Sequence, residues 1–228
     1  MQLESITWQR MAERLAGHLD DAAGVNGVND NGGGGGGEAG WQRVGIDGAP
    51  AARTAVLAGE LADVLRPRGR PVLVVAAEGF LRPASLRFEF GREDVGSYLG
   101  GWYDTAALWR EVFGPTDPGG SGRVLPDLWN PATDRATRSP YAELPPGGVL
   151  IVHGPLLLGH WFPFDLSVHI SLSPGALARR TEESARWTLP AFARYEAETG
   201  PAALADVLVR ADDPRHPAWT GPRAGHGG

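Results

Sequence analysis

Cysteine is absent from the 228 residues of this chain. Without thiols the chain can build neither disulfides nor a thiolate metal site, and this absence favours a reducing compartment. Long apolar runs are missing too, because no segment approaches the roughly 18 residues of a membrane span. Glu4, Arg10 and Glu13 interrupt the stretch where a signal peptide needs its apolar core. We therefore expect a cytoplasmic protein with no membrane partner.

Dense clusters of positive charge are also missing. The chain has 21 basic and 27 acidic residues, and its formal net charge is -6. No group of basic residues is dense enough to neutralise a run of phosphates, so we do not expect nucleic acid as a partner. The chain does have 42% hydrophobic residues, which is sufficient for one α/β domain with a substantial core.

The two ends of the chain differ in composition from its centre. Residues 1–23 are expected to form an amphipathic helix, because the following apolar residues recur near helical spacing: Leu3, Ile6, Met11, Leu15 and Leu19. Residues 24–40 contain the run Gly32 to Gly37 and predict a flexible linker. The alternative, a phosphate loop, is disfavoured because this run follows no strand and lacks a nearby Lys-Ser/Thr. Residues 214–228, rich in Pro and Gly, predict a loose tail.

Between residues 41 and 213, short apolar runs alternate with helical segments. Strands are expected at 43–47, 71–76, 149–152, 166–170 and 207–209. Helices are expected at 54–65, 176–180 and 189–198. This alternation indicates a parallel sheet in a single α/β domain. Residues 114–138, dense in Gly, Pro, Asp and Asn, predict an irregular excursion of a kind that often forms binding loops.

The first expected strand ends in Gly45-Ile46-Asp47-Gly48, followed by a turn of small residues and a helix. This layout presents backbone N–H groups and a helix N-terminus to phosphate. At this point the chain resembles the uridine kinase family, and the resemblance continues in order from about Arg43 to His216. It implies a parallel-sheet α/β fold of the P-loop NTPase type, a three-layer sandwich related to nucleoside kinases. It also implies ATP and magnesium as cofactors and a nucleoside or phosphate compound as small-molecule partner.

The phosphate-binding positions implied by this resemblance are Gly48, Ala52, Arg53 and Thr54. Without a gap, the second Gly, the Lys and the Ser/Thr of the family's loop become Arg53, Thr54 and Ala55. The family's lysine reaches the β- and γ-phosphates and its hydroxyl holds magnesium, and Ala55 has no oxygen. With one residue deleted, Arg53 and Thr54 instead stand over Lys and Ser/Thr, and Arg53 provides the positive charge. Both alignments are open at this point.

The segment at 78–83, Glu-Gly-Phe-Leu-Arg-Pro, is similar to the family's Asp-x-Phe segment. This similarity implies that Glu78 is the base toward a substrate hydroxyl and that Phe80 and Arg82 contact the substrate. A carboxylate just after a buried strand is also a common turn or cap residue, so the structural alternative for Glu78 has equal weight.

Two further segments are similar to the family. Tyr103 and Asp104 begin a stretch that resembles Phe-Asp-x-x-Ala-Leu, which implies substrate contacts, although Asp104 fits equally well as a helix N-cap. The strand at 149–152 resembles the family's third core strand, where an acid helps to hold magnesium. Here His153 stands in that place, and a neutral imidazole is a poor ligand for this hard cation. No metal ligand is therefore predicted, and a transition-metal site including His160 and His169 is disfavoured as well.

The segment from Ala178 to Arg186 resembles the family's lid, whose arginines close over the transferred phosphoryl group. Arg179 and Arg186 are the catalytic candidates there, and Arg180 is a phosphate-binding candidate. Glu182 and Glu183 lie among them, so a salt-bridged helical surface is the alternative.

Three hypotheses follow for function. The first is a nucleoside kinase that transfers the γ-phosphoryl group of ATP to a uridine-like hydroxyl. The second is a catalytically inactive relative that binds a small ligand or serves a regulatory role, which the altered loop and His153 favour. The third is a scaffold that engages a partner through its N-terminal helix and linker, and a surviving pocket of Glu78, Asp104 and the lid arginines would count against it.

Overall fold

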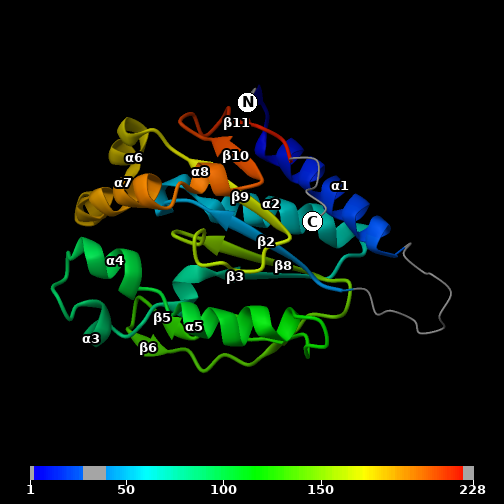
Figure 1. The fold of residues 1–228 in the computed structure, drawn as a ribbon, viewed down its shortest axis with the longest axis horizontal. Coiled ribbons are helices and arrows are strands. Elements are labelled where there is room, and N and C mark those ends of the chain that lie inside the picture. Colours follow the sequence, from blue (N-terminus) through cyan, green and yellow to red (C-terminus); the bar gives the residue numbers. More distant parts are fainter. Residues whose placement is uncertain (1–2, 28–39, 223–228) are drawn as a thin grey trace.

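The computed structural model describes residues 3–27 and 40–222, and the statements below refer to these residues. A seven-stranded sheet forms the centre of the molecule (Figure 1). In spatial order its strands are β1 (Glu4–Ser5), β11 (Ala218–Trp219), β10 (Val207–Arg210), β9 (Leu166–Ser171), β2 (Gln42–Asp47), β8 (Val149–Gly154) and β3 (Val72–Ala76). The strands from β10 to β3 are parallel, whereas β11 pairs antiparallel with β10 and β1.

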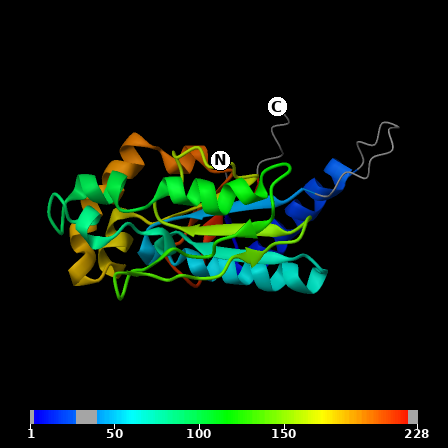
Figure 2. The ribbon, with the colours of Figure 1, turned by 90° about the horizontal axis from the view of Figure 1, so that it is seen from below.

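Helices cover both faces of this sheet (Figure 2). On one face α2 (Thr54–Leu65) packs against β8 and β3, and α1 (Trp8–Gly27) packs against α2. On the other face lies α5 (Thr105–Leu108), which continues as one π-helical turn, η4 (Trp109–Phe113). The central strands are buried because their runs of Val, Ile and Leu meet helices on both sides. The three-layer α/β fold predicted from the sequence is thereby confirmed.

The remaining elements are short. The other α-helices are α3 (Ala84–Arg87), α4 (Val95–Gly101), α6 (Pro174–Arg180), α7 (Leu189–Glu198) and α8 (Pro201–Leu204). The 3-10 segments are η1 (Pro50–Ala52), η2 (Arg66–Arg68), η3 (Ala77–Phe80), η5 (Gly114–Thr116) and η6 (Glu183–Thr188). The excursion predicted at 114–138 is mostly irregular. Its two-residue strands are β4 (Arg123–Val124), β5 (Trp129–Asn130) and β6 (Arg135–Ala136), and β7 (Ala142–Glu143) pairs with β4.

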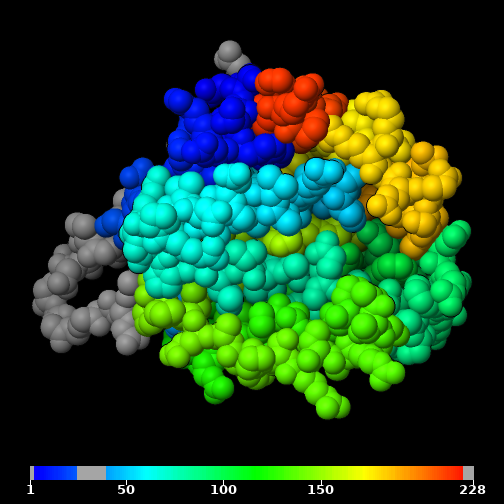
Figure 3. Space-filling model, turned by 180° about the vertical axis from the view of Figure 1, so that it is seen from behind, coloured from blue at the N-terminus to red at the C-terminus, as the bar shows by residue number. Residues whose placement is uncertain are grey.

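The ends of the described chain differ from the prediction. The first helix begins at Trp8 and runs to Gly27, so residues 24–27, expected in the linker, are helical. The rest of the predicted linker, except Gly40, lies outside the described residues. The segment after Pro214, expected to be loose, instead contributes β11, and its Trp219 is fully buried. Its indole supplies an apolar surface that packs beside α1, and in Figure 3 the described N-terminal segment (blue) lies beside the described C-terminal segment (red).

The order of the strands determines where a ligand can bind. Strand β2 lies between β8 and β9. The connection that leaves β2 leads to β3 on one side of it, whereas the connection that leaves β8 leads to β9 on its other side. In open α/β sheets, ligands bind in the crevice outside the carboxyl ends of the strands at such a point. Here that crevice is formed by the loop after Asp47. Among the described residues no helix has the length and apolar character needed to cross a bilayer.

Candidate functional site

The loop after β2 is short and tightly held. It runs from Gly48 through η1 to Arg53, and α2 begins at Thr54. Gly48 has no room for a side chain, because a Cβ there would lie 2.9 Å from the backbone oxygen of Ile170. The backbone of Arg53 has the left-handed conformation, with φ 57 and ψ 52, which glycine adopts without steric cost. Its place at the helix N-cap favours the gap-free alignment, in which Arg53 replaces the family's second glycine.

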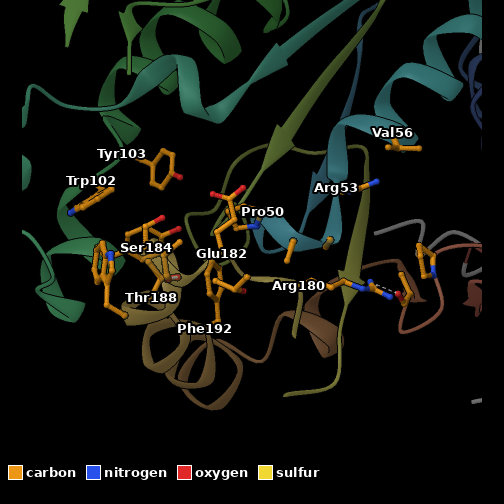
Figure 4. A pocket seen from close by; sticks show the side chains of 18 of the residues that line it. Pro50, Arg53, Val56, Trp102, Tyr103, Arg180, Glu182, Ser184, Thr188 and Phe192 are labelled. Atoms are coloured by element: carbon orange, nitrogen blue, oxygen red, sulfur yellow. Dashed lines mark hydrogen bonds between the residues drawn. The ribbon is translucent and has the colours of Figure 1, made fainter. Parts of the chain in front are cut away.

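The groups that would hold a triphosphate are absent or engaged elsewhere. All 21 basic residues of the chain are arginines, so it has no lysine for the loop. The buried hydroxyl of Thr54 lies 3.2 Å from Nδ1 of His153, and Ala55 has no oxygen. The side chain of Arg53 is exposed, and in Figure 4 it lies on the far side of the loop from Tyr103. Burial lowers the pKa of His153, which therefore stays neutral at pH 7.

The acid at the end of β2 is also fully engaged. Asp47 is completely buried, and its Oδ1 accepts a hydrogen bond from the backbone N–H of Leu157 at 2.8 Å. Its Oδ2 lies 2.6 Å from Nδ1 of His169. In the described part of the chain, no group of three or more His, Asp or Glu side chains is placed to hold a metal ion. Magnesium needs free oxygen ligands, and the phosphates of ATP need a lysine near them. The residues of this loop provide neither, so they do not fit the magnesium-ATP complex.

A large cleft nevertheless opens beside the loop (Figure 4). Its volume is about 1010 Å³, and it reaches from the loop to η6 and α7. The loop contributes η1 and Arg53, α2 contributes Val56, and the segment before α5 contributes Trp102 and Tyr103. The two ends of the chain add Trp8 and the residues around Pro214, where Nε1 of Trp8 donates to the Pro214 carbonyl at 2.8 Å.

Aromatic rings form the wall of the cleft away from Arg53. Tyr98 on α4 is the centre of this aromatic wall, with ring centroids 5.0 Å from Trp102, 5.5 Å from Trp187 and 5.7 Å from Phe192. The Trp102 and Trp187 rings are 5.3 Å apart. Because Trp187 and Phe192 belong to η6 and α7, these contacts hold η6 and α7 against α4. Edge-to-face pairs of this kind contribute about 0.5–1.5 kcal/mol each beyond the area that they bury.

Glu78 lies behind the aromatic wall. Its Oε2 is shielded from solvent and has no hydrogen-bond partner, and a Cβ on Gly154 would lie 3.1 Å from it. Burial raises the pKa of Glu78. Burial also raises the pKa of Tyr98 and of Tyr103, and the nearby carboxylate of Glu78 adds to both shifts. Glu78 and the two phenols therefore form a sheltered polar group next to the cleft.

Three of the predicted substrate contacts have other positions. Phe80 is fully buried in the core under α5, so its ring has no surface to offer a ligand. Arg82 lines a separate, smaller depression beside α4. Asp104 caps α5, because its carboxylate accepts the backbone N–H of Ala107 at 2.9 Å. Of the four predicted substrate contacts, Tyr103 is the one that lines the main cleft.

The lid arginines are also dispersed. Arg180 lines the cleft, but its guanidinium donates to the backbone carbonyls of Ala211 and Asp212. Arg179 is exposed and does not line the cleft. Arg186 is exposed as well and pairs with Glu183 at 2.6 Å. The salt-bridged surface considered as an alternative therefore describes Arg186 in this structure.

Sequence reasoning missed most of the aromatic wall. Tyr98 and Trp102 are four residues apart, a spacing that places two side chains on one helical face, and this was the available signal. Nothing in the sequence indicates that Trp187 meets them. The contacts of Asp47 were missed for the same reason, because His169 is 122 residues away along the chain.

Comparison with known proteins gives a structural likeness. No protein-family model matches the sequence, and no curated protein matches it. A possible uridine kinase from Bacillus stearothermophilus matches with 20% identity and a TM-score of 0.61, over 85% of this chain and 98% of that chain. A protein assigned as a fructose transport system kinase from Silicibacter matches with 22% identity and a TM-score of 0.54, over 84% and 94%. D-glycerate 3-kinase from Cryptococcus neoformans matches with 15% identity and a TM-score of 0.51, over 84% and 80%. At these identities the likeness shows the fold.

Proposed function

Starting from the kinase fold that this chain shares with those structures, we propose that it binds a nucleoside or a similar small molecule without transferring a phosphoryl group. The observation that carries this proposal is that one site combines an open cleft with a loop that lacks the groups needed to bind phosphates. The cleft beside the loop is open and lined by aromatic side chains, yet the loop has no lysine and Thr54 is turned toward His153.

The shape and lining of the cleft support binding of a small molecule. Its volume of about 1010 Å³ lies near the upper end of the range of about 300–1,000 Å³ that is usual for ligand pockets. The aromatic wall offers flat apolar surface for a ring, and Tyr103 offers a hydroxyl. This cleft is not the pocket of Glu78, Asp104 and the lid arginines that would count against the scaffold hypothesis, but it offers a small ligand a site of suitable size.

The electrostatics argue against catalysis. Phosphoryl transfer depends on positioning and on neutralising the developing charge. Losing one preorganised electrostatic contact commonly costs about 2.7–4 kcal/mol, or roughly 100- to 1,000-fold in rate. Three such positions are changed here, at Thr54, Ala55 and His153. The loss of even two independent contacts would reduce the rate by about 10,000-fold or more.

Two assays on the purified chain test this proposal together. Thermal unfolding with a panel of nucleosides measures binding, and mass spectrometry after incubation with magnesium-ATP measures nucleoside monophosphate. We expect at least one nucleoside to raise the midpoint of unfolding, because binding to the folded state alone stabilises it. We expect no monophosphate above the level given by the Glu78→Ala variant.

Each assay can overturn one part of the proposal. Monophosphate that disappears in both Glu78→Ala and Arg53→Ala would establish a kinase with a rebuilt loop, and would end the non-catalytic interpretation. Absence of a thermal shift with every nucleoside would exclude that class of ligand. The Arg66→Ala variant is the matched control, because Arg66 is an exposed arginine that pairs with Asp63 outside the cleft and should behave as wild type in both assays.

A further inference from the structure

Helix α7 presents one face to two different parts of the molecule. Phe192, Tyr195 and Glu196 follow the i, i+3, i+4 spacing that places side chains on one face of a helix. Phe192 lines the cleft. The Tyr195 hydroxyl receives the backbone N–H of Leu158 at 3.0 Å and donates to the Leu158 carbonyl at 3.2 Å. The position of α7 on the sheet therefore determines where the Phe192 side of the cleft lies.

Glu196 attaches the same helix to a buried histidine. Its Oε1 lies 3.1 Å from Nε2 of His169, and on the other side of the ring Nδ1 lies 2.6 Å from Oδ2 of Asp47. An ionised carboxylate can only accept hydrogen bonds, so a ring that bonds to two carboxylates donates from both nitrogens. An imidazole that donates from both nitrogens carries a positive charge. The ring is buried, so this charge is held largely away from water.

The carboxylate on the far side of the ring lies at the base of the loop. Asp47 and His169 are paired in register on the parallel strands β2 and β9. Gly48, which begins the loop, follows Asp47 directly and packs against the backbone of Ile170. A series of hydrogen bonds thus connects the start of the loop to the helix on the opposite side of the cleft, and it runs through Asp47, His169 and Glu196.

We infer that His169 is a positioning residue, which as an imidazolium between Asp47 and Glu196 fixes α7, and with it the Phe192 side of the cleft, relative to the loop. The expected effect on ligand affinity rests on the proposed function. The placement of α7 does not rest on it, because that placement is a property of the protein without ligand.

The surroundings of the ring agree with this role. The titratable groups that face the pair are Asp47 from β2, Glu196 and Tyr195 from α7, and His160 from the segment between β8 and β9. Burial lowers the pKa of His160, so it adds no competing positive charge at neutral pH. Burial also raises the pKa of Tyr195, so the phenol stays neutral and donates. His169 is therefore the cation that the two carboxylates share.

The test compares two variants on the same helix. Glu196→Gln removes the charge that faces His169, whereas Glu198→Gln removes an exposed charge that pairs with Arg194 at 2.7 Å and is the matched control. Hydrogen exchange of the ligand-free chain at pH 7 should be at least tenfold faster in α7 of Glu196→Gln than in wild type or Glu198→Gln. NMR should show both His169 ring nitrogens protonated in the wild type at pH 7.

Uridine binding provides the third measurement. If uridine binds the wild type, its affinity should fall several-fold in Glu196→Gln and remain unchanged in Glu198→Gln. A neutral His169 ring at pH 7, or equal exchange in the two variants, would overturn the positioning role. If uridine fails to bind the wild type while exchange and NMR behave as expected, the choice of ligand is wrong and the positioning role stands.

Discussion

Replacing His169 by leucine is expected to lower the free energy of unfolding by about 3–5 kcal/mol, the usual cost of removing one partner of a buried ion pair. The substitution leaves the Asp47 carboxylate in a site that is inaccessible to solvent, with the Leu157 N–H as its remaining hydrogen-bond donor. A loss of this size lowers the melting temperature by about 6–20 °C in a chain of this length. Urea unfolding at pH 7, followed by tryptophan fluorescence, measures it.

The matched control for this prediction is the double variant Asp47→Asn with His169→Leu. Asparagine keeps an acceptor for the Leu157 N–H but carries no charge, so most of the lost stability should return. Equal destabilisation in the single and double variants would mean that His169 acts through packing alone. The charge on Asp47 would then have no part in its effect.

The same ion pair predicts a dependence of stability on pH. Burial by itself would lower the pKa of His169, but hydrogen bonds to Asp47 and Glu196 outweigh it and raise the pKa from 6.5 to about 9. A histidine whose pKa is raised on folding contributes its full stability below the unfolded pKa and loses it as the pH rises through the folded value. The contribution of His169 should therefore decline from about pH 6.5 to pH 9, and the decline should be absent in His169→Leu.

The sequence predicted the fold because strands buried on both faces carry their own signal. The run around Ile151 contains no polar residue and is buried on β8, as expected for a strand covered on both faces. The similar run around Val74 forms β3 at the edge of the sheet, where it is mostly half-buried. The loop after Asp47 was located for a similar reason, since a strand, small residues and a helix follow one another directly. Both features are local in the sequence.

The contacts inside the site could not be predicted, because they join distant segments. Whether Arg53 faces the phosphate site depends on its left-handed backbone, which the residue type does not reveal. Arg180 lines the cleft, yet its donors are taken by carbonyls some 30 residues further along the chain. Asp104 acts as the N-cap of α5 through one hydrogen bond, which its carboxylate accepts from the N–H of Ala107.

The composition of the C-terminal segment predicts less structure than the segment has, and Trp219 is the residue whose replacement should show this. The segment after Pro214 is rich in Pro and Gly, which predicts a loose tail, but Trp219 is fully buried between α1 and the sheet. The guanidinium of Arg14 lies over its ring, 4.8 Å from the centroid. Replacing Trp219 by alanine should lower the free energy of unfolding by about 3–5 kcal/mol, as is usual for removing a large aromatic side chain from a core.

Trp161 provides the matched control for Trp219→Ala, because its side chain is 89% exposed. Trp161→Ala removes the same atoms from the surface and should change the free energy of unfolding by at most about 0.5 kcal/mol. If β11 holds the first helix on the sheet, Trp219→Ala should also speed hydrogen exchange in α1, whose Trp8 donates to the Pro214 carbonyl. Similar small effects of the two substitutions would return residues 214–228 to the loose tail that their composition predicts. A large effect would instead show that β11 belongs to the folded domain and supports the segments around Trp8 and Pro214, which line the cleft.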